Sequence, residues 1–314
     1  MSPIRRRRAL RLPALTVVVV ALLAALAVAG CGGSASGAPD GKISAVGAEN
    51  QYANVISQIG GKYVQVTAVE SNPNTDPHTF EASPSVARVI GSAELIVQNG
   101  LGYDSFMDKV EAAVPASGRK IINVQHLLGL PDSTPNPHLW YKTTTMPAVA
   151  RALAADLSAL QPRHAAYFHA RQRAFDRSLQ PWYRALAQIK ANYPAAPVAT
   201  TEPVGDYMLQ AAGTKDLTPF SFQANIMNGV DPAPQDVALQ DSFFSGHRVK
   251  AFVYNQQVTD SLTESFLSSA HRYGIPVVGV YETMPAGFTY QSWMLAETRA
   301  LQRAVADHVS TVKL

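Results

Sequence analysis

Two short segments of this 314-residue chain each place one histidine directly after a proline. They read Thr75-Asp76-Pro77-His78 and Asn136-Pro137-His138-Leu139-Trp140. Proline fixes its own φ and restricts the residue before it, so the backbone directs each imidazole and little entropy is lost when the ring becomes ordered. Neutral histidine is the commonest metal ligand in proteins. Either histidine alone is as easily an ordinary loop residue, but the pair favours one shared metal ion.

Two glutamates in the second half of the chain come directly after predicted strands. Glu202 follows a strand expected at 196–201, and Glu282 follows one expected at 275–281. A single glutamate in such a place is more often a solvated loop carboxylate. Two of them at equivalent strand ends, facing a half that offers two imidazoles, favour a metal site. The expected ligands of one divalent ion per chain are therefore His78, His138, Glu202 and Glu282.

This donor set contains two imidazoles, two carboxylates and no thiolate. Such a mixture suits borderline and hard divalent ions, and not Cu(I). We therefore expect the ion to be Zn²⁺ or Mn²⁺, with Fe²⁺ as a further candidate.

Short apolar runs alternate with helical patterns through most of the chain. The expected strands cover 42–48, 64–69, 95–98, 120–124, 196–201, 249–255 and 275–281. The expected helices cover 50–59, 84–91, 103–113, 205–212, 234–244, 259–273 and 290–309. This alternation predicts an α/β fold of two lobes, each with a mainly parallel sheet flanked by helices. Ligands of such sheets bind outside the carboxyl ends of the strands, where all four candidates lie.

The stretch from 146 to 192 is rich in Ala, Leu, Arg and Gln, which form helices well. We expect one long rigid helix region here, with Pro162 starting its second part and Pro181 kinking it. It separates an N-terminal lobe at 42–145 from a C-terminal lobe at 193–314.

The first forty-one residues have the pattern of an export signal and a tether. Residues 1–30 contain five arginines followed by an apolar stretch, which is typical of a signal peptide. Val28-Ala29-Gly30-Cys31 resembles a lipobox, and residues 31–41 then form a Gly/Ser-rich flexible linker. The expected mature chain is extracytoplasmic and is anchored to the membrane by a lipid on Cys31. The alternative is an uncleaved transmembrane anchor.

The charge and the cysteine content argue against nucleic-acid binding, an intrachain disulfide and a thiolate metal ligand. Beyond residue 31 the chain has 21 basic and 23 acidic residues, a net charge of −2. We therefore expect no polybasic face and no nucleic-acid partner. The single cysteine excludes an intrachain disulfide, and a lipidated cysteine leaves any metal to histidine and carboxylate ligands.

Several segments resemble one family, the metal-binding solute-binding lipoproteins of bacterial ABC importers of the zinc, manganese and iron cluster (cluster A-I type). The resemblance runs from 42 to 309. It rests on 76–85, Asp-Pro-His-Thr-Phe-Glu-Ala-Ser-Pro-Ser; on 95–101, Leu-Ile-Val-Gln-Asn-Gly-Leu; on 136–140, Asn-Pro-His-Leu-Trp; and on Thr201-Glu202 leading into Tyr207 and Ala212-Gly213. Glu282 stands where the family usually has an aspartate, and Lys142 replaces an acidic residue. The His-rich loop of many zinc-specific members is missing from the sequence.

The resemblance implies two lobes bridged by a rigid helix and a metal held between them. It also implies delivery of that metal to a permease with its ATPase, by a chain that is a monomer and not an enzyme. The alternative from the residues alone is an extracytoplasmic metallohydrolase, which needs an open coordination position and a nearby base. Asp76 and Asp206 are the acids nearest to the candidate ligands.

Overall fold

The computed structural model describes residues 41–74 and 77–314, and the chain from residue 38 onward forms one compact unit. The expected signal peptide, Cys31 and almost all of the linker lie outside the described residues. In the described part of the chain, no helix is long and apolar enough to span a membrane.

The N-terminal lobe is a parallel four-stranded sheet in the order β2-β1-β3-β4. Its strands are β1 (Ile43–Glu49), β2 (Val64–Glu70), β3 (Leu95–Gln98) and β4 (Lys120–Asn123). Its helices are α2 (Asn50–Gly60), α3 (Pro84–Ser92), α4 (Ser105–Ala113), α5 (Val124–Leu127) and α6 (Thr145–Leu160). Alternate residues of β1 enter different apolar clusters: Ala45 joins the core with α2 and α6, and Val46 packs with α3 and α4. Burial on both faces explains why the strands are continuous apolar runs.

The C-terminal lobe repeats this plan with the order β6-β5-β7-β8. Its strands are β5 (Pro197–Thr200), β6 (Lys215–Asp216), β7 (Ala251–Asn255) and β8 (Val277–Val280). Its helices are α9 (Asp206–Ala211), α10 (Phe220–Met227), α11 (Pro234–Ser245), α12 (Ser261–Arg272) and α13 (Tyr290–Asp307). β6 and α10 here, and α5 in the N-terminal lobe, were not expected, because elements of two to eight residues are too short to show a period.

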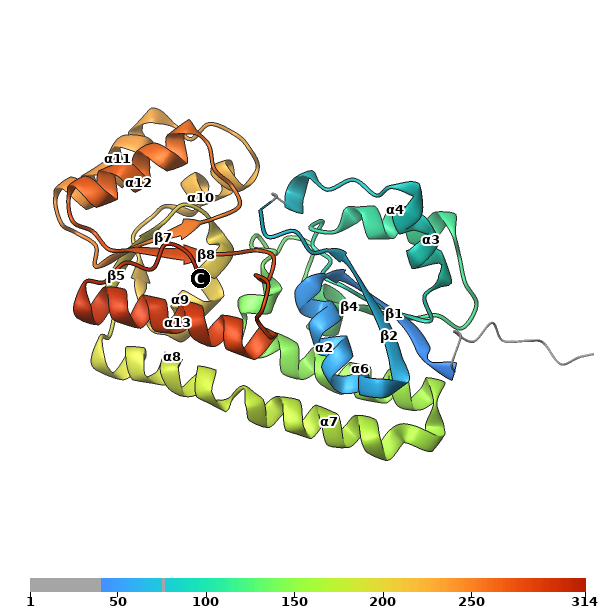
Figure 1. The fold of residues 1–314 in the computed structure, drawn as a ribbon. Coiled ribbons are helices and arrows are strands. Elements are labelled where there is room, and N and C mark those ends of the chain that lie inside the picture. Colours follow the sequence, from blue (N-terminus) through green and yellow to red (C-terminus); the bar gives the residue numbers. More distant parts are fainter. Residues whose placement is uncertain (1–40, 75–76) are drawn as a thin grey trace, which may run out of the picture. The chain divides into compact units, whose positions relative to one another are not determined.

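The segment between the lobes is helical, as expected, and it is divided into three helices. After α6 comes a short 3₁₀ turn, Pro162–His164, then α7 (Ala165–Ser178) and α8 (Gln180–Asn192). Pro162 begins the second part as expected, and the break expected at Pro181 falls at Leu179, with Pro181 in the first turn of α8. In Figure 1, α7 and α8 run in line along the lower side of the view, beneath the N-terminal and the C-terminal sheet respectively.

One apolar core continues from lobe to lobe. The same buried cluster contains Tyr141 after β4, Trp182 on α8 and Trp293 on α13. Tyr141 meets Trp293 edge-to-face at 5.7 Å between ring centroids, and the Trp182 indole donates to Thr298 at 3.0 Å. A site between the lobes is therefore built on shared packing, which opposes large relative motion.

Candidate metal centre

His138 is held at the end of the loop after β4 by the side chain of Asn136. The Asn136 Oδ1 accepts hydrogen bonds from the backbone N–H of His138 at 3.0 Å and from its ring Nδ1 at 2.8 Å. The Asn136 amide nitrogen donates to the carbonyl of Pro203 at 2.7 Å, which fixes the orientation of the amide. His138 is fully buried. Its ring therefore has one orientation and one tautomer, with the proton on Nδ1.

The other ring nitrogen of His138 faces a carboxylate. Its Nε2 lies 3.1 Å from Oε2 of Glu282, and burial lowers the pKa of the imidazole. A neutral ring with its proton on Nδ1 turns an Nε2 lone pair toward an acceptor oxygen. Two facing acceptors repel unless a cation, either a proton or a metal ion, lies between them. The contact therefore favours occupation by positive charge.

His78 approaches the same carboxylate oxygen from the other loop. It lies in a 3₁₀ turn, Pro77–Thr79, and its Nε2 is 3.3 Å from Oε2 of Glu282. The Tyr103 hydroxyl donates to that oxygen at 3.0 Å. The His78 side chain is 23% exposed, whereas the Glu282 side chain is fully buried. An ion that enters from solvent therefore meets His78 before it meets Glu282.

Glu282 lies two residues after the end of β8. Side chains from both lobes form hydrogen bonds with its main chain. Its N–H donates to Gln257 Oε1 at 2.6 Å, and its carbonyl accepts from Gln51 Nε2 at 3.2 Å. Burial by itself raises the pKa of the carboxyl group, but the hydrogen bonds and charge of His138 and His78 outweigh it and hold the pKa below its ordinary value. We therefore regard Glu282 as ionised. Because Nδ1 of His138 donates to Asn136, its Nε2 lone pair is left to bind a cation beside Glu282.

These three side chains form a group that could hold a metal ion. Donor atoms of His78, His138 and Glu282 lie within 4.8 Å of one another, the one such group among the described residues. The two nitrogen–oxygen separations of 3.1 and 3.3 Å are close to the roughly 3.3 Å between nitrogen or oxygen ligands that surround Zn²⁺ tetrahedrally at about 2.0–2.1 Å. The donor types and spacing fit a borderline divalent ion.

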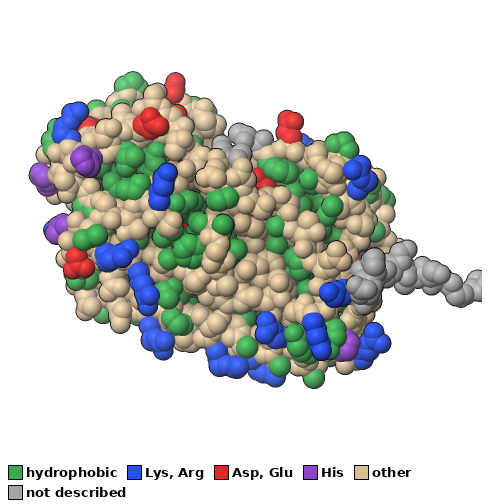
Figure 2. Space-filling view, in the orientation of Figure 1, with side chains coloured by type: hydrophobic (Ala, Val, Ile, Leu, Met, Phe, Trp, Pro, Cys, Tyr) green, Lys and Arg blue, Asp and Glu red, His purple; other side chains and the backbone are tan. Residues whose placement is uncertain are grey.

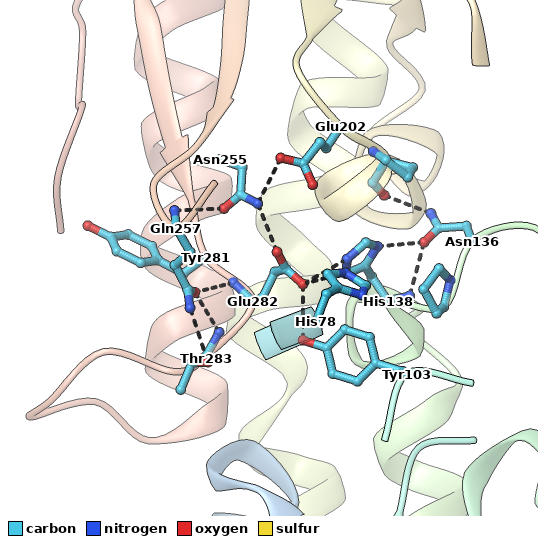
Figure 3. A network of polar contacts seen from close by, with 12 residues as sticks. His78, Tyr103, Asn136, His138, Glu202, Asn255, Gln257, Tyr281, Glu282 and Thr283 are labelled. Atoms are coloured by element: carbon cyan, nitrogen blue, oxygen red, sulfur yellow. Dashed lines mark hydrogen bonds and ion pairs between the residues drawn. The ribbon is translucent and has the colours of Figure 1, made fainter. Parts of the chain in front are cut away.

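Glu202, the fourth expected ligand, is not part of this group. It is buried at the end of β5, and its Oε1 accepts from Asn255 Nδ2 at 3.1 Å. The same nitrogen donates to Oε1 of Glu282 at 2.8 Å, so one amide joins the two carboxylates (Figure 3). In the structure Glu202 is therefore linked to the group of His78, His138 and Glu282 only through the side chain of Asn255.

Asn255, which donates to both glutamates, is a candidate site residue that the sequence analysis did not identify. It ends β7, which lies between β5 and β8 in the sheet, and Glu202 and Glu282 follow those two neighbours. Its backbone N–H donates to Thr201 Oγ1, and its Oδ1 accepts from the N–H of Gln257, both at 3.0 Å. The signal that could have found it is a polar residue at the end of the strand between two ligand-bearing strands.

Asp206 does not offer a catalytic base. Its carboxylate accepts from Gln223 Nε2 at 3.1 Å, and the same nitrogen donates to Asp216 at 3.0 Å. Burial and then the charge of Asp216 raise the pKa of Asp206 to about 7. It belongs to a network beside β5 and β6 and not to the metal group. Asp76 lies outside the described residues.

The fold and the donor set together define a two-lobed α/β protein with a group of side chains between its lobes that could hold a divalent metal ion. The sequence profile of the family "Zinc-uptake complex component A periplasmic" matches residues 46–304. The chain belongs to this family, which confirms the resemblance found in the sequence.

Relatives of known name agree with this placement. The manganese-binding lipoprotein MntA of Bacillus subtilis is 26% identical over 171 residues, which cover 52% of this chain and 56% of the relative. The zinc-binding protein TroA of Treponema pallidum is 26% identical over 152 residues, covering 47% and 49%. The chain thus spans about half the length of these curated relatives.

Solved structures show the same fold. The periplasmic zinc-binding protein TroA of Treponema pallidum superposes with a TM-score of 0.71 at 19% identity, covering 86% of this chain and 100% of TroA. The solute-binding protein FpvC of Pseudomonas aeruginosa, solved with Mn²⁺, has a TM-score of 0.69 at 19% identity and covers 85% and 99%. The expected α/β architecture of two parallel-sheet lobes is confirmed.

Proposed function

We propose that this protein captures one divalent transition metal ion, Zn²⁺ or Mn²⁺, outside the cytoplasmic membrane and delivers it to an ABC permease and its ATPase. The observation that carries the proposal is the convergence of two imidazoles on one buried carboxylate oxygen. The proposed ligands are His78, His138 and Glu282. Glu202 is a candidate fourth ligand, which in this structure accepts a hydrogen bond from Asn255. The family and its named relatives support transport over hydrolysis.

The chemistry of the site also favours binding over catalysis. A hydrolytic metal site needs a water position with a general base beside it. The acid closest in sequence to the C-terminal ligands, Asp206, is engaged with Gln223 instead. The Tyr103 hydroxyl touches the ligand Glu282, and burial raises the pKa of this phenol well above 10. A phenol that stays protonated can orient a carboxylate but cannot accept a proton from water.

We further propose that the mature chain is a monomer anchored by a lipid on Cys31. The support is the lipobox-like sequence before Cys31 and the lipoprotein name of the relative MntA. Replacing Cys31 by Ala should release the protein from the membrane fraction or block its processing. Unchanged membrane retention with an unchanged mass would favour an uncleaved anchor.

The experiment that tests metal capture is calorimetric titration of metal-free protein with Zn²⁺ and Mn²⁺. We expect one site per chain in the wild type and a large loss of affinity in His78→Ala and in His138→Ala. His169→Ala, an exposed histidine on α7, is the matched control and should bind as the wild type does. Wild-type affinity in both test variants would overturn the proposed site.

A further inference from the structure

The three helices that connect the lobes carry an excess of positive charge that the whole-chain total conceals. Residues 145–192 contain seven basic and two acidic residues. The basic ones are Arg151, Arg163, Arg171, Arg173, Arg177, Arg184 and Lys190, and all seven are exposed. This corrects the expectation that no polybasic face remains. We call these seven residues the basic face.

Of the seven cations, only Arg151 acts on an acid of this segment, because its charge opposes the rise that burial causes in the pKa of Asp176. Asp156 is half-buried and pairs with Lys120 of β4 at 3.9 Å. Asp176 is half-buried and accepts from Gln172. Among the residues that the structure describes, no carboxylate lies within ion-pair distance of any of the seven.

The rest of the described chain has no comparable excess. Residues 41–144 and 193–314 contain 14 basic and 20 acidic residues, but six of those acids are buried: Glu49, Glu70, Asp104, Glu202, Glu282 and Glu297. The surfaces of the lobes are thus close to neutral. Figure 2 shows Lys and Arg side chains along the lower edge of the view, over α7 and α8, and a mixed surface elsewhere.

The described chain begins beside this face. The carbonyl of Gly41 accepts a hydrogen bond from the side chain of Gln161, at the turn between α6 and α7, at 2.8 Å. Tyr63 stacks on His164 in the same turn at 3.8 Å, and the Lys62 ammonium lies 5.1 Å from the Tyr63 ring. Nine residues separate Cys31 from Gly41, so an extended connection of ten Cα–Cα steps reaches at most about 36 Å. That is comparable to the roughly 40 Å length of α7 and α8 together.

We infer that the basic face docks on the anionic phospholipid headgroups of the membrane to which the chain is tethered. Seven exposed cations on the connecting helices, a remainder close to neutral and a described chain that begins beside these helices all favour this occupant. Attraction of this kind decays within a Debye length and is weakened by salt. Docking is therefore reversible and sets orientation without fixing the protein in place.

The orientation has a consequence for capture. The segment from Pro77 to α3, which carries His78, runs along the upper side of the view, away from α7 and α8 (Figure 1). With the basic face on lipid, the exposed donor of the metal site is turned away from the membrane, toward incoming ions. Delivery to the permease then requires release of the basic face. Docking rests on the proposed membrane tether, and this delivery step rests in addition on the proposed metal transport.

The test uses the full chain reconstituted into vesicles that carry an acceptor dye on some lipid headgroups. A donor dye is placed on α7 in Ala174→Cys and on α12, in the upper part of Figure 1, in the control Ser265→Cys; both positions are exposed. The unsubstituted chain is labelled in parallel, and if Cys31 takes dye, both substitutions are made in Cys31→Ser. Every sample is the unprocessed full chain, whose apolar stretch within residues 1–30 keeps it on the vesicle without a lipid on Cys31. Zn²⁺ titration of each sample reports separately on the metal site.

In vesicles of phosphatidylcholine and phosphatidylglycerol in equal parts, energy transfer at low salt should be stronger from α7 than from α12. The difference should vanish in phosphatidylcholine alone and at high salt. Combining Arg173→Gln, Arg177→Gln and Arg184→Gln should lower the docked-to-free ratio about a hundredfold, since each cation near an anionic surface contributes roughly a fivefold factor. Equal transfer from both positions in the anionic vesicles would overturn the inference and leave the basic face to an acidic protein partner.

Discussion

The rims of the two lobes present the proposed ligands in different ways. The N-terminal rim offers imidazoles on loops, and its two histidines differ: His138 is buried and hydrogen-bonded to Asn136, whereas His78 is partly exposed. The C-terminal rim offers carboxylates that leave the strands directly, and Asn255 joins them. A carboxylate pair is costly to bury unless donors or cations compensate it. The C-terminal rim therefore has a preformed anionic half-site, and the N-terminal rim adds the neutral nitrogens that complete it.

This contrast assigns different tasks to the lobes. The C-terminal half-site provides most of the electrostatic attraction for any divalent cation. The N-terminal nitrogens provide the preference for borderline transition metals over hard ions such as Mg²⁺. We therefore expect the largest effect on metal affinity at Glu282, which both imidazoles face, and the smallest at Glu202, which lies outside the group.

The largest effect is expected for Glu282→Gln. The substitution keeps the size of the side chain but removes the charge that both imidazoles face. Loss of an outer partner typically costs tenfold to a hundredfold in metal affinity, so loss of the central ligand should cost more than about a hundredfold. Calorimetric titration with Zn²⁺ measures the change. Glu264→Gln on α12, an exposed glutamate, is the control; an affinity for Zn²⁺ in Glu282→Gln equal to that of the control would contradict the shared-oxygen site.

The second effect tests whether the C-terminal half-site is preformed. In Asn255→Ala the donor between Glu202 and Glu282 is lost, and the two carboxylates are left to repel each other. We expect affinity to fall by about tenfold to a hundredfold. The exposed Asn192→Ala is the matched control. A loss for Asn255→Ala that is no greater than for Asn192→Ala would show that the carboxylates are held by the main chain alone.

How much of the site the sequence could predict depends on which residues carry local signals. The two histidine loops were recognisable because a proline precedes each ligand, and the glutamates because each follows a buried strand. No sequence pattern around Asn255 indicates that it contacts both glutamates, because that contact depends on the position of β7 between β5 and β8 in the sheet. Glu202 was placed at the correct rim, but the direction of its carboxylate depends on a hydrogen bond that no linear pattern encodes.

The fold followed the same rule. Strands and helices with a clear period were predicted to within a few residues, because burial on one or two faces sets the period. The linking segment was predicted as helix, but the reversal after α6 depends on packing between α6 and α7. Pro162 marked the break in the sequence, but a proline does not encode the direction in which the next helix leaves. The net charge of the whole chain gave no sign that exposed arginines are concentrated on α7 and α8, because a total does not record where charges lie.

The third effect concerns the stability of the C-terminal lobe. Burial raises the pKa of Asp206 to about 7 and that of Asp216 to about 6, from the ordinary value of 3.8. Between about pH 4 and 7 the folded chain then holds protons that the unfolded chain has released, so the free energy of unfolding should fall as pH rises through this window. Asp206→Asn should flatten the profile and raise the free energy of unfolding at pH 8 by roughly 1–2 kcal/mol.

Chemical denaturation of metal-free protein across this pH range measures that slope. The exposed Asp231→Asn is the control and should keep the wild-type profile. A wild-type slope in Asp206→Asn would mean that the Asp206 carboxyl group titrates as an ordinary one. The N-terminal histidines are unchanged in both variants, so their contribution to the slope cancels in the comparison.

The smallest effect is expected for Glu202→His, which asks whether the second carboxylate takes part in metal binding. In the structure its Oε1 is committed to Asn255, outside the group formed by His78, His138 and Glu282. If Glu202 joins the metal when the ion binds, two carboxylates and two imidazoles surround it, a harder set than three imidazoles and one carboxylate. Replacing Glu202 by histidine should then weaken Mn²⁺ more than Zn²⁺, while Zn²⁺ stays the tighter ion in both proteins, as the Irving–Williams order requires. Competition titration of the two ions against wild type and Glu202→His gives the ratio directly. An unchanged Mn²⁺/Zn²⁺ ratio would show that the C-terminal rim contributes Glu282 alone, and that Glu202 acts only through Asn255.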